Sequence, residues 1–247
     1  MGGWDYVADN RDLILDGFRT TVWLTVSSGL LSLVLGTVLA IMRVGPIPPL
    51  RWLGTTYVTI VRNTPLTLLF IFSTFGLPRM EIRLSFTAFA IVALTTYTTA
   101  FVCEGVRSGI NTVDPGEVEA ARSIGLPFAL VLRLVVLPQA FRAVIPPLTG
   151  VLNALLKNTS VAVAFNVAEA NQVLRRLQNN DASATFPLLL TTAFGYMVLA
   201  AVLFGGSWLL EKKVDPERKG RDLGLPPSAA TASQAHAGAG GFGGAGI

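Results

Sequence analysis

Cysteine and histidine, which supply many catalytic and metal centres, are almost absent: the chain of 247 residues has one of each. Cys103 alone cannot form an internal disulfide or a cysteine-based metal site. His236 lies in a Gly/Ala-rich tail with no candidate ligand beside it. These absences exclude a Cys/His metal centre and a Ser/His/Asp or Cys/His hydrolase. We therefore expect no metal site and no enzymatic activity in this chain.

Charged residues are scarce as well, at 14% of the chain, whereas 51% of the residues are hydrophobic and the mean hydropathy is +0.57. This composition is too apolar for an ordinary soluble domain and predicts an integral membrane protein. The formal net charge of +4 does not indicate nucleic-acid binding, because no basic patch is interleaved with aromatic residues. In a membrane chain, an excess of Lys and Arg marks cytoplasmic loops instead.

Intervals without charge locate the membrane spans, because about 20 apolar residues cross a bilayer as a helix and charges inside a span are costly. Two of the five intervals are interrupted: the second contains Arg62, and the fourth has Arg142 near its start and Lys157 at its end. The sequence predicts an all-α integral membrane protein with five transmembrane helices. The expected spans are 20–42, 52–75, 84–103, 138–156 and 182–210.

The distribution of Lys and Arg predicts the side of each terminus. The stretch "EKKVDPERKGR" after the last span has five basic residues in eleven, whereas the N-terminal "WDYVADNRDLILDG" is acidic. This asymmetry places the C-terminus in the cytoplasm and the N-terminus outside. We divide the chain into an extracytoplasmic segment (1–17), a transmembrane domain (18–213) and a cytoplasmic tail (214–247) whose low-complexity end is expected to be disordered.

A short polar helix is predicted between spans three and four, in "VDPGEVEAARSIGL". Asp114 is a suitable N-cap, Pro115 fits the first turn, Glu117 has capping-box spacing, and Gly125 can end the helix. An isolated helix this short is marginal in water, so a partner or the protein's own spans must hold it. A well-capped connecting loop is the alternative interpretation. The residues available for contact are Glu117, Glu119, Ala120, Ala121, Arg122 and Gly125.

The spacing from Glu119-Ala120-Ala121 through Gly125 to Leu137-Pro138 resembles the EAA signature of bacterial ABC importer permeases, with Val135 where the family usually has Ile. The motifs "RNTPL", "LPQAFRAVIPPL" and "LLKNTS" resemble the polar amino-acid (histidine/glutamine/glutamate) family. Two longer stretches, "VRNTPLTLLFIFSTFGL" and "SGINTVDPGEVEAARSIGL", are most similar to glutamate permease subunits of actinobacteria. The resemblance covers roughly residues 17–213.

This resemblance implies a translocation subunit of an ATP-driven importer in the bacterial inner (cytoplasmic) membrane, with glutamate as the expected substrate and aspartate or glutamine as alternatives. Its polar helix would be the coupling helix that docks on an ATPase. The implied partners are two ATPase subunits, a second identical or related permease, an extracytoplasmic binding protein and membrane lipid. ATP and Mg would be bound by the ATPase, because this chain has no GxxxxGK[ST] motif.

The interrupted spans suggest where substrate passes. Arg62, Asn63 and Thr64 are expected near the middle of the bilayer, where Pro65 breaks the helix and frees the carbonyl of Val61 to face a cavity. Alternatively, Arg62 pairs internally or reaches an interface. In the fourth span, polar side chains suited to an amino acid follow the Pro pair at 146–147, although they could instead cap a helix end. They are Lys157, Asn158, Thr159 and Ser160.

An ion-gradient-driven secondary carrier or a channel is the competing functional class. It would require acidic residues inside the spans to relay the coupling ion. Glu104 lies near the end of span three, where it is expected to pair with Arg107 on the helix surface.

Several members of the resembled family have Asp where this chain has Asn158, and the loss of that acid favours an acidic or neutral substrate.

Overall fold

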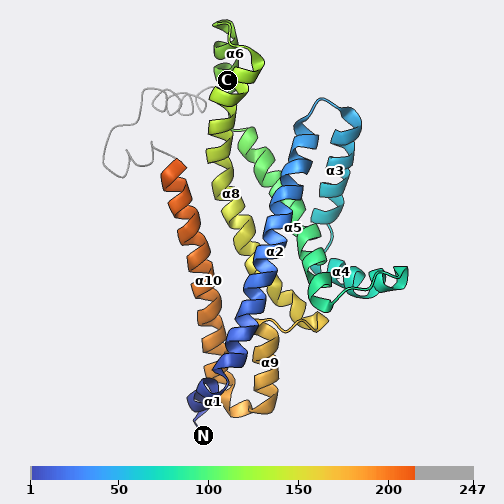
Figure 1. Ribbon diagram of the computed structural model, residues 1–247, viewed down its shortest axis with the longest axis vertical. Helices are drawn as coiled ribbons and strands as arrows, with labels where there is room; N and C mark the ends of the chain where they lie inside the picture. The colour runs from blue at the N-terminus through green and yellow to red at the C-terminus, as the bar shows by residue number, and fades with distance from the viewer. Residues whose placement is uncertain (1, 215–247) are drawn as a thin grey trace, which may run out of the picture.

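The computed structural model describes residues 2–214, and these residues form helices joined by short turns, with no strand among them (Figure 1). The expected disorder of the tail concerns residues outside this described range, apart from Val214. The α-helices are α1 (Gly3–Asp9), α2 (Arg11–Val44), α3 (Pro48–Arg62), α4 (Leu66–Ile71), α5 (Phe86–Ile110), α6 (Pro115–Ser123), α7 (Phe128–Val131), α8 (Leu137–Asn158), α9 (Ala170–Asn180) and α10 (Thr185–Val214).

The prediction of an all-α membrane protein is confirmed. Within residues 2–214, four helical segments are long and apolar enough to cross a membrane, and a fifth span is present if the bent pair of α3 and residues 66–80 counts as one. The four are Arg11–Val44, Phe86–Ile110, Ala129–Phe165 and Ala182–Val214.

Span two is broken where proline predicts a break. Residues 66–80 turn by 103° from α3, because Pro65 has no N–H to continue the helical ladder. The expected free carbonyl of Val61 is wrong, however: Thr64 N donates to Val61 O at 3.1 Å in a tight turn. The Asn63 amide and the Thr64 hydroxyl donate to the carbonyls of Thr59 and Ile60, at 2.7 and 2.8 Å. These two side chains thus cap the end of α3.

Two π-helices interrupt the helical segments, and both precede a Leu-Pro pair. Helix η1 (Phe72–Gly76) is followed by Leu77-Pro78, and η3 (Leu132–Val136) is followed by Leu137-Pro138. A proline ring collides with the carbonyl four residues earlier, and a wider turn relieves that collision. The shared sequence pattern explains the shared geometry, which places a π-helix between α6 and α8, inside the segment Ala129–Phe165.

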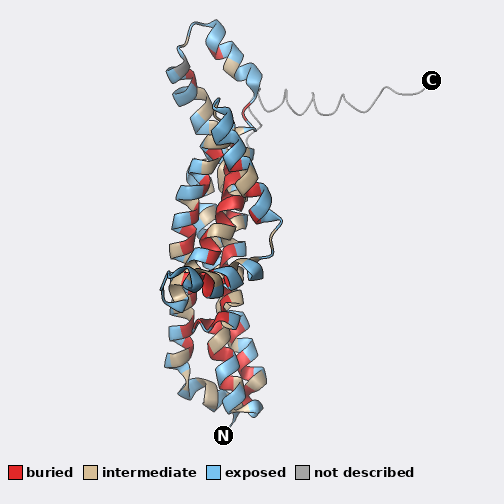
Figure 2. Cartoon of the chain, turned by 90° about the vertical axis from the view of Figure 1, so that its right-hand side faces the viewer, coloured by how far each residue is buried: buried red, intermediate tan, exposed pale blue. Residues whose placement is uncertain are grey.

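Helix α5 lies at the centre of the bundle and packs against α2, α3 and α8. Small residues permit this close packing: a Cβ atom added at Gly36 would lie 2.5 Å from Val102, and one at Gly109 would lie 2.2 Å from Val144. Buried residues follow the length of the bundle, whereas the α6 end is largely exposed (Figure 2). Helix α10 is mostly exposed and apolar, as expected of a helix that faces lipid.

Candidate functional site

Helix α6 forms a projecting element at one end of the molecule, beyond the end of α2 (Figure 1). The Asp114 side chain caps its start by accepting a hydrogen bond from Gly116 N at 2.8 Å. At its end Gly125 has φ +84°, and the hydrogen bonds from Gly125 N to Arg122 O and from Leu126 N to Ala121 O form a Schellman motif. The predicted cap and glycine stop are therefore both present.

The contact residues of α6 do not all face outward. Glu117, Glu119, Ala120 and Arg122 are exposed, but Ala121 is buried against its own chain. An apolar residue that the sequence interpretation missed, Ile124, is 79% exposed at the end of the helix. Ile124 therefore adds an exposed apolar side chain close to the exposed Arg122 at this end of α6.

A side-chain hydrogen bond joins α6 to the start of α8. Gln139 of α8 donates to the Glu117 carboxylate, which thus reaches another helix rather than completing a capping box with Asp114. Gln139 lies three residues after the π-helix η3. A displacement of α6 would accordingly pull directly on the first turn of α8, next to an irregular helical segment.

Apart from α6, a cluster of charged side chains places three arginines around one carboxylate. Glu104 of α5 accepts a hydrogen bond from Arg43 of α2, and its oxygens lie 3.8 Å from the guanidinium nitrogens of both Arg62 and Arg107. The expected Glu104–Arg107 pair is present as part of this larger group. The internal pairing of Arg62, left open by the sequence, is also present. With three positive charges and one negative charge, the cluster carries a surplus of positive charge.

A pocket of about 400 Å³ lies beside this cluster, between α5 and α8. The Arg62 guanidinium stands 5.6 Å from the centre of the Phe101 ring, and Phe101 itself lines the pocket. The volume suits a small ligand. The pocket is lined by Tyr97, Thr98, Phe101, Pro147, Gly150, Val151, Ala154, Leu155 and Asn158.

The candidates at the end of α8 separate into two groups. Asn158 lines the pocket, and Lys157 is exposed. The hydroxyls of Thr159 and Ser160, just after α8, each donate at 2.7 Å to a carbonyl three residues earlier, in the last turn of α8. The structure therefore brings Arg62 and Asn158 to the edges of one pocket, whereas Asn63, Thr64, Thr159 and Ser160 have local hydrogen bonds.

A buried carboxylate, absent from the sequence-based candidates, fixes the helix at the opposite end of the molecule. Glu169 is fully buried and accepts backbone hydrogen bonds from Asn171 and Gln172 at the start of α9, at 3.0 and 2.9 Å. The Tyr196 hydroxyl of α10 also donates to it at 2.9 Å. Burial raises the pKa of the Glu169 carboxyl above its usual value. An acid directly before the amphipathic pattern of Val173, Leu174 and Leu177 was the available signal.

Replacing Glu169 with Gln is expected to destabilise the protein by about 1–3 kcal/mol, because the new amide NH₂ would face one of the two backbone donors. The measurement is the midpoint of thermal unfolding in detergent. Asp181→Asn is the control, since Asp181 is more exposed and caps only a single turn. Equal midpoints for Glu169→Gln and the unaltered protein would contradict the assigned role of Glu169.

Comparison with known proteins extends these observations. Residues 32–216 match the family described as "Binding-protein-dependent transport system inner membrane component". The glutamate transport system permease protein GluC of Corynebacterium efficiens is 41% identical, over 84% of this chain and 96% of the relative. The probable glutamine ABC transporter permease protein GlnM of Bacillus subtilis is 38% identical, over 84% and 95%.

A solved structure shares the fold. The crystal structure of an amino acid ABC transporter with histidines superimposes with a TM-score of 0.77 at 26% identity, covering 84% of this chain and 96% of the solved chain. The pattern of four or five candidate spans within residues 2–214, the EAA spacing on a capped projecting helix and these matches agree. This chain belongs to the family of inner-membrane components of binding-protein-dependent transport systems and is a permease subunit of a bacterial ABC importer.

Proposed function

We propose that this chain forms half of the translocation path of an importer for glutamate, with glutamine and aspartate as the alternative substrates. The observation that carries the proposal is the surplus positive charge around Glu104, placed beside the pocket between α5 and α8. The relatives with glutamate and glutamine in their names support the same substrate class. A site of this charge favours an anionic substrate over a cationic one.

Arg62 is the proposed receptor for a substrate carboxylate. Arg62 forms an ion pair with Glu104, but the 3.8 Å between its guanidinium nitrogen and the carboxylate oxygen is too long for a hydrogen bond. About half of the Arg62 side chain is exposed. Arg43, whose side chain is largely buried, would keep Glu104 neutralised when Arg62 turns to the substrate. Asn158 would supply amide contacts from the other wall. Lys157 would add positive charge near it, with Asn63, Thr64, Thr159 and Ser160 shaping the path.

The α6 helix is the proposed coupling element. Glu117, Glu119, Ala120 and Arg122 would contact the ATPase, with Ala121 and Gly125 setting the position of that surface. The hydrogen bond between Glu117 and Gln139 would carry the displacement into α8. ATP and Mg belong to two partner ATPase subunits in this account. A second permease, identical or related, would complete the path.

This assignment of α6 determines the proposed topology. If α6 lies in the cytoplasm, the end of the molecule formed by α1 and α9 lies outside, because it is at the opposite end of the bundle (Figure 1). Residues 1–17 would then be extracytoplasmic, residues 18–213 would form the transmembrane domain, and residues 214–247 would be a cytoplasmic tail. Helix α10 would contact lipid along its exposed apolar side.

The substrate class can be tested with the complete transporter in proteoliposomes. We expect labelled glutamate to accumulate and labelled arginine not to accumulate, because the cluster around Glu104 repels a cationic side chain. If the path also accepts glutamine or aspartate, an excess of that unlabelled amino acid should reduce the accumulation of labelled glutamate. Accumulation of arginine at the rate of glutamate would contradict the proposed charge selection.

A further inference from the structure

Helix α9 presents a basic surface that the translocation path does not use. It lies outside the candidate spans, between residues 129–165 and 182–214. Arg175 and Arg176 are adjacent and exposed on it. Within residues 2–214, neither arginine has an ion pair or a side-chain hydrogen bond. Two unpaired positive charges are therefore available to an external partner.

The apolar side of α9 is already occupied by its own protein. Val173, Leu174 and Leu177 are buried and pack in a cluster that includes Ile14 of α2 and Leu188 of α10. A helix that binds a bilayer surface inserts its apolar side between the lipids. Because that side of α9 is covered, its remaining surface is polar, which favours a protein partner over the membrane.

Helix α9 is also held in a fixed position. Glu169 caps its start and accepts the hydrogen bond from Tyr196, while Ala170 N donates to the Thr21 hydroxyl of α2 at 3.2 Å. A Cβ atom added at Gly17 would lie 2.9 Å from Val173, so α2 and α9 are in close contact. A surface fixed on two membrane-spanning helices is preorganised, which reduces the entropic cost of binding.

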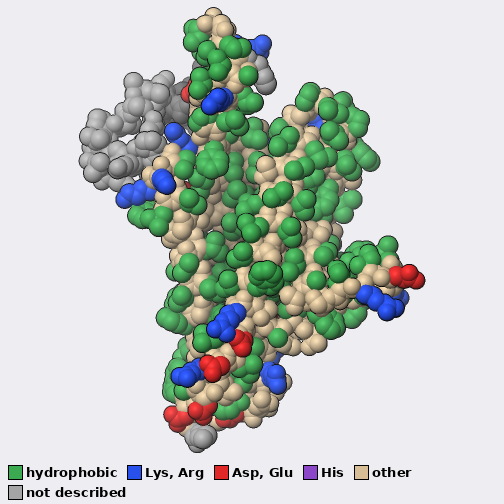
Figure 3. Space-filling model, viewed as in Figure 1, with side chains coloured by type: hydrophobic (Ala, Val, Ile, Leu, Met, Phe, Trp, Pro, Cys, Tyr) green, Lys and Arg blue, Asp and Glu red, His purple; other side chains and the backbone are tan. Residues whose placement is uncertain are grey.

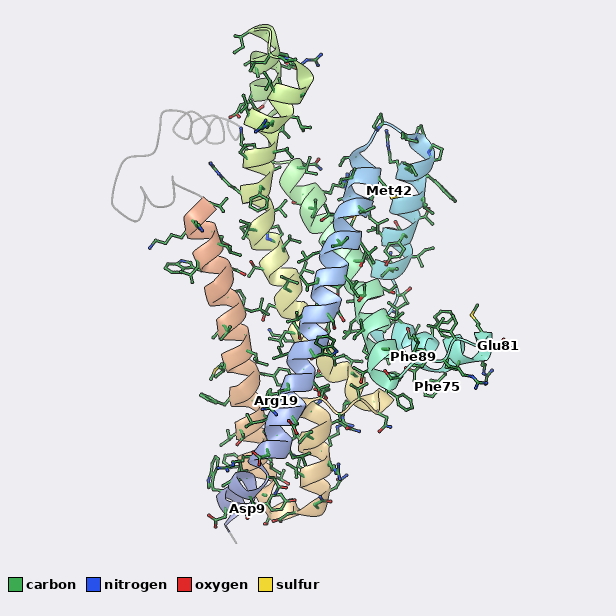
Figure 4. The ribbon with its side chains drawn as sticks, in the orientation of Figure 1. Asp9, Arg19, Met42, Phe75, Glu81 and Phe89 are labelled. Atoms are coloured by element: carbon green, nitrogen blue, oxygen red, sulfur yellow. The ribbon has the colours of Figure 1, made fainter. Side chains whose placement is uncertain are left out.

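The charge pattern around α9 is mixed. Acidic side chains gather at the end of the molecule formed by α1, and a basic side chain lies over α9 (Figure 3). In Figure 4, Asp9 lies at the α1 end and Arg19 lies on α2, whereas Phe75 and Glu81 lie on the segment that projects sideways from the bundle. The basic surface of α9 is therefore a local feature, and its charge is complementary to a partner that presents acidic residues at one place.

We propose that Arg175 and Arg176 form a docking pair for an acidic patch on the extracytoplasmic binding protein. This inference rests on the proposed function, which places α9 outside the cell. The family is described as binding-protein-dependent, so a soluble partner must reach this end of the permease. Exposed charges of this kind act mainly on the rate of association and its salt dependence.

The experiment measures ATPase activity of the complete transporter in nanodiscs while the binding protein is titrated. Arg175→Glu/Arg176→Glu is expected to raise the half-maximal binding-protein concentration at least about tenfold at low salt, with little change in basal ATPase activity. Arg175→Gln/Arg176→Gln should give a smaller rise. Asn179→Ala/Asn180→Ala is the control on the same helix and should resemble the unaltered protein. Equal thermal unfolding midpoints would show that the variants fold.

High salt should weaken docking in the unaltered protein and change it little in the Gln variant, because the screened charges are gone. A half-maximal concentration that is the same in all variants would overturn the docking pair. So would an effect that appears only in nanodiscs with anionic lipid, since the arginines would then bind lipid headgroups. Absence of stimulation in the unaltered transporter would overturn the proposed function and the docking pair together.

Discussion

Replacing Arg62 with Gln is expected to reduce glutamate uptake about tenfold to a hundredfold. A guanidinium binds a carboxylate through charge-assisted hydrogen bonds worth about 1.5–3 kcal/mol, which an amide does not reproduce. Arg62 lies over Phe101 at the edge of the pocket, where such a carboxylate would be partly shielded from water. Uptake of labelled glutamate into proteoliposomes that contain the complete transporter is the measurement.

Three comparisons make the Arg62 prediction specific. Arg62→Lys should retain part of the uptake, because an ammonium keeps the charge without the planar geometry. Arg107→Gln is the matched control: it removes another charge 3.8 Å from Glu104, whereas the described cation–π contact with Phe101 is made by Arg62, so this change should cost less. A loss of uptake that is larger for glutamate than for glutamine would indicate that Arg62 binds the side-chain carboxylate of glutamate. An equal loss for both would indicate that Arg62 binds the α-carboxylate. Normal uptake of both by assembled Arg62→Gln would show that Arg62 is structural.

Replacing Gly125 with Val is expected to abolish most of the binding-protein-stimulated ATPase activity and uptake. Gly125 has φ +84°, a conformation that a β-branched residue strongly disfavours. No atom lies within 4 Å of a Cβ added there, so the cost comes from the backbone and not from a collision. The strained backbone would move the end of α6 and with it the exposed Ile124.

The backbone explanation has a direct control. Asn tolerates the left-handed conformation better than other residues with a side chain, so Gly125→Asn should retain most of the activity. Membrane insertion should be similar in both variants, because the turn lies outside the membrane spans. Full stimulation and uptake in Gly125→Val would contradict the role of α6 in coupling. Equal losses in both variants would show that side-chain bulk, not the backbone, matters at this position.

Local sequence signals predicted the parts of the structure that depend on neighbouring residues. Asp114, Pro115 and Gly125 predicted the start and end of α6 because caps and left-handed stops act within one turn. Pro65 predicted the break in span two because a missing N–H acts at the residue itself. The spans followed from length and composition, which the bilayer constrains strongly.

These local signals could not predict contacts between segments that are distant in the sequence. Arg43 and Glu104 are 61 residues apart in sequence, and their hydrogen bond depends on how α2 packs on α5. The buried side of Ala121 likewise depends on where α6 lies relative to the rest of the chain. The two π-helices had a local cause in their Leu-Pro pairs, but a proline after a helical stretch predicts a disturbance without specifying its form.

Helix α9 was missed for a different reason. With 11 residues it is too short to stand out as a span, and its polar residues resemble an ordinary loop. Its stability comes from Glu169, Thr21 and Tyr196, which lie on three different segments. The sequence interpretation assigned no role to Glu169, although a buried carboxylate must be hydrogen-bonded to remain there.

The central claim is that this permease moves glutamate with energy from a separate ATPase, and one measurement tests it most directly. The permease, its ATPase and its binding protein are reconstituted in proteoliposomes, and uptake of labelled glutamate is followed with ATP at the ATPase side and with ionophores that abolish ion gradients. We expect accumulation that requires ATP, the ATPase and the binding protein and that persists with the ionophores. Accumulation by the permease alone, driven by an ion gradient and lost with the ionophores, would contradict the account.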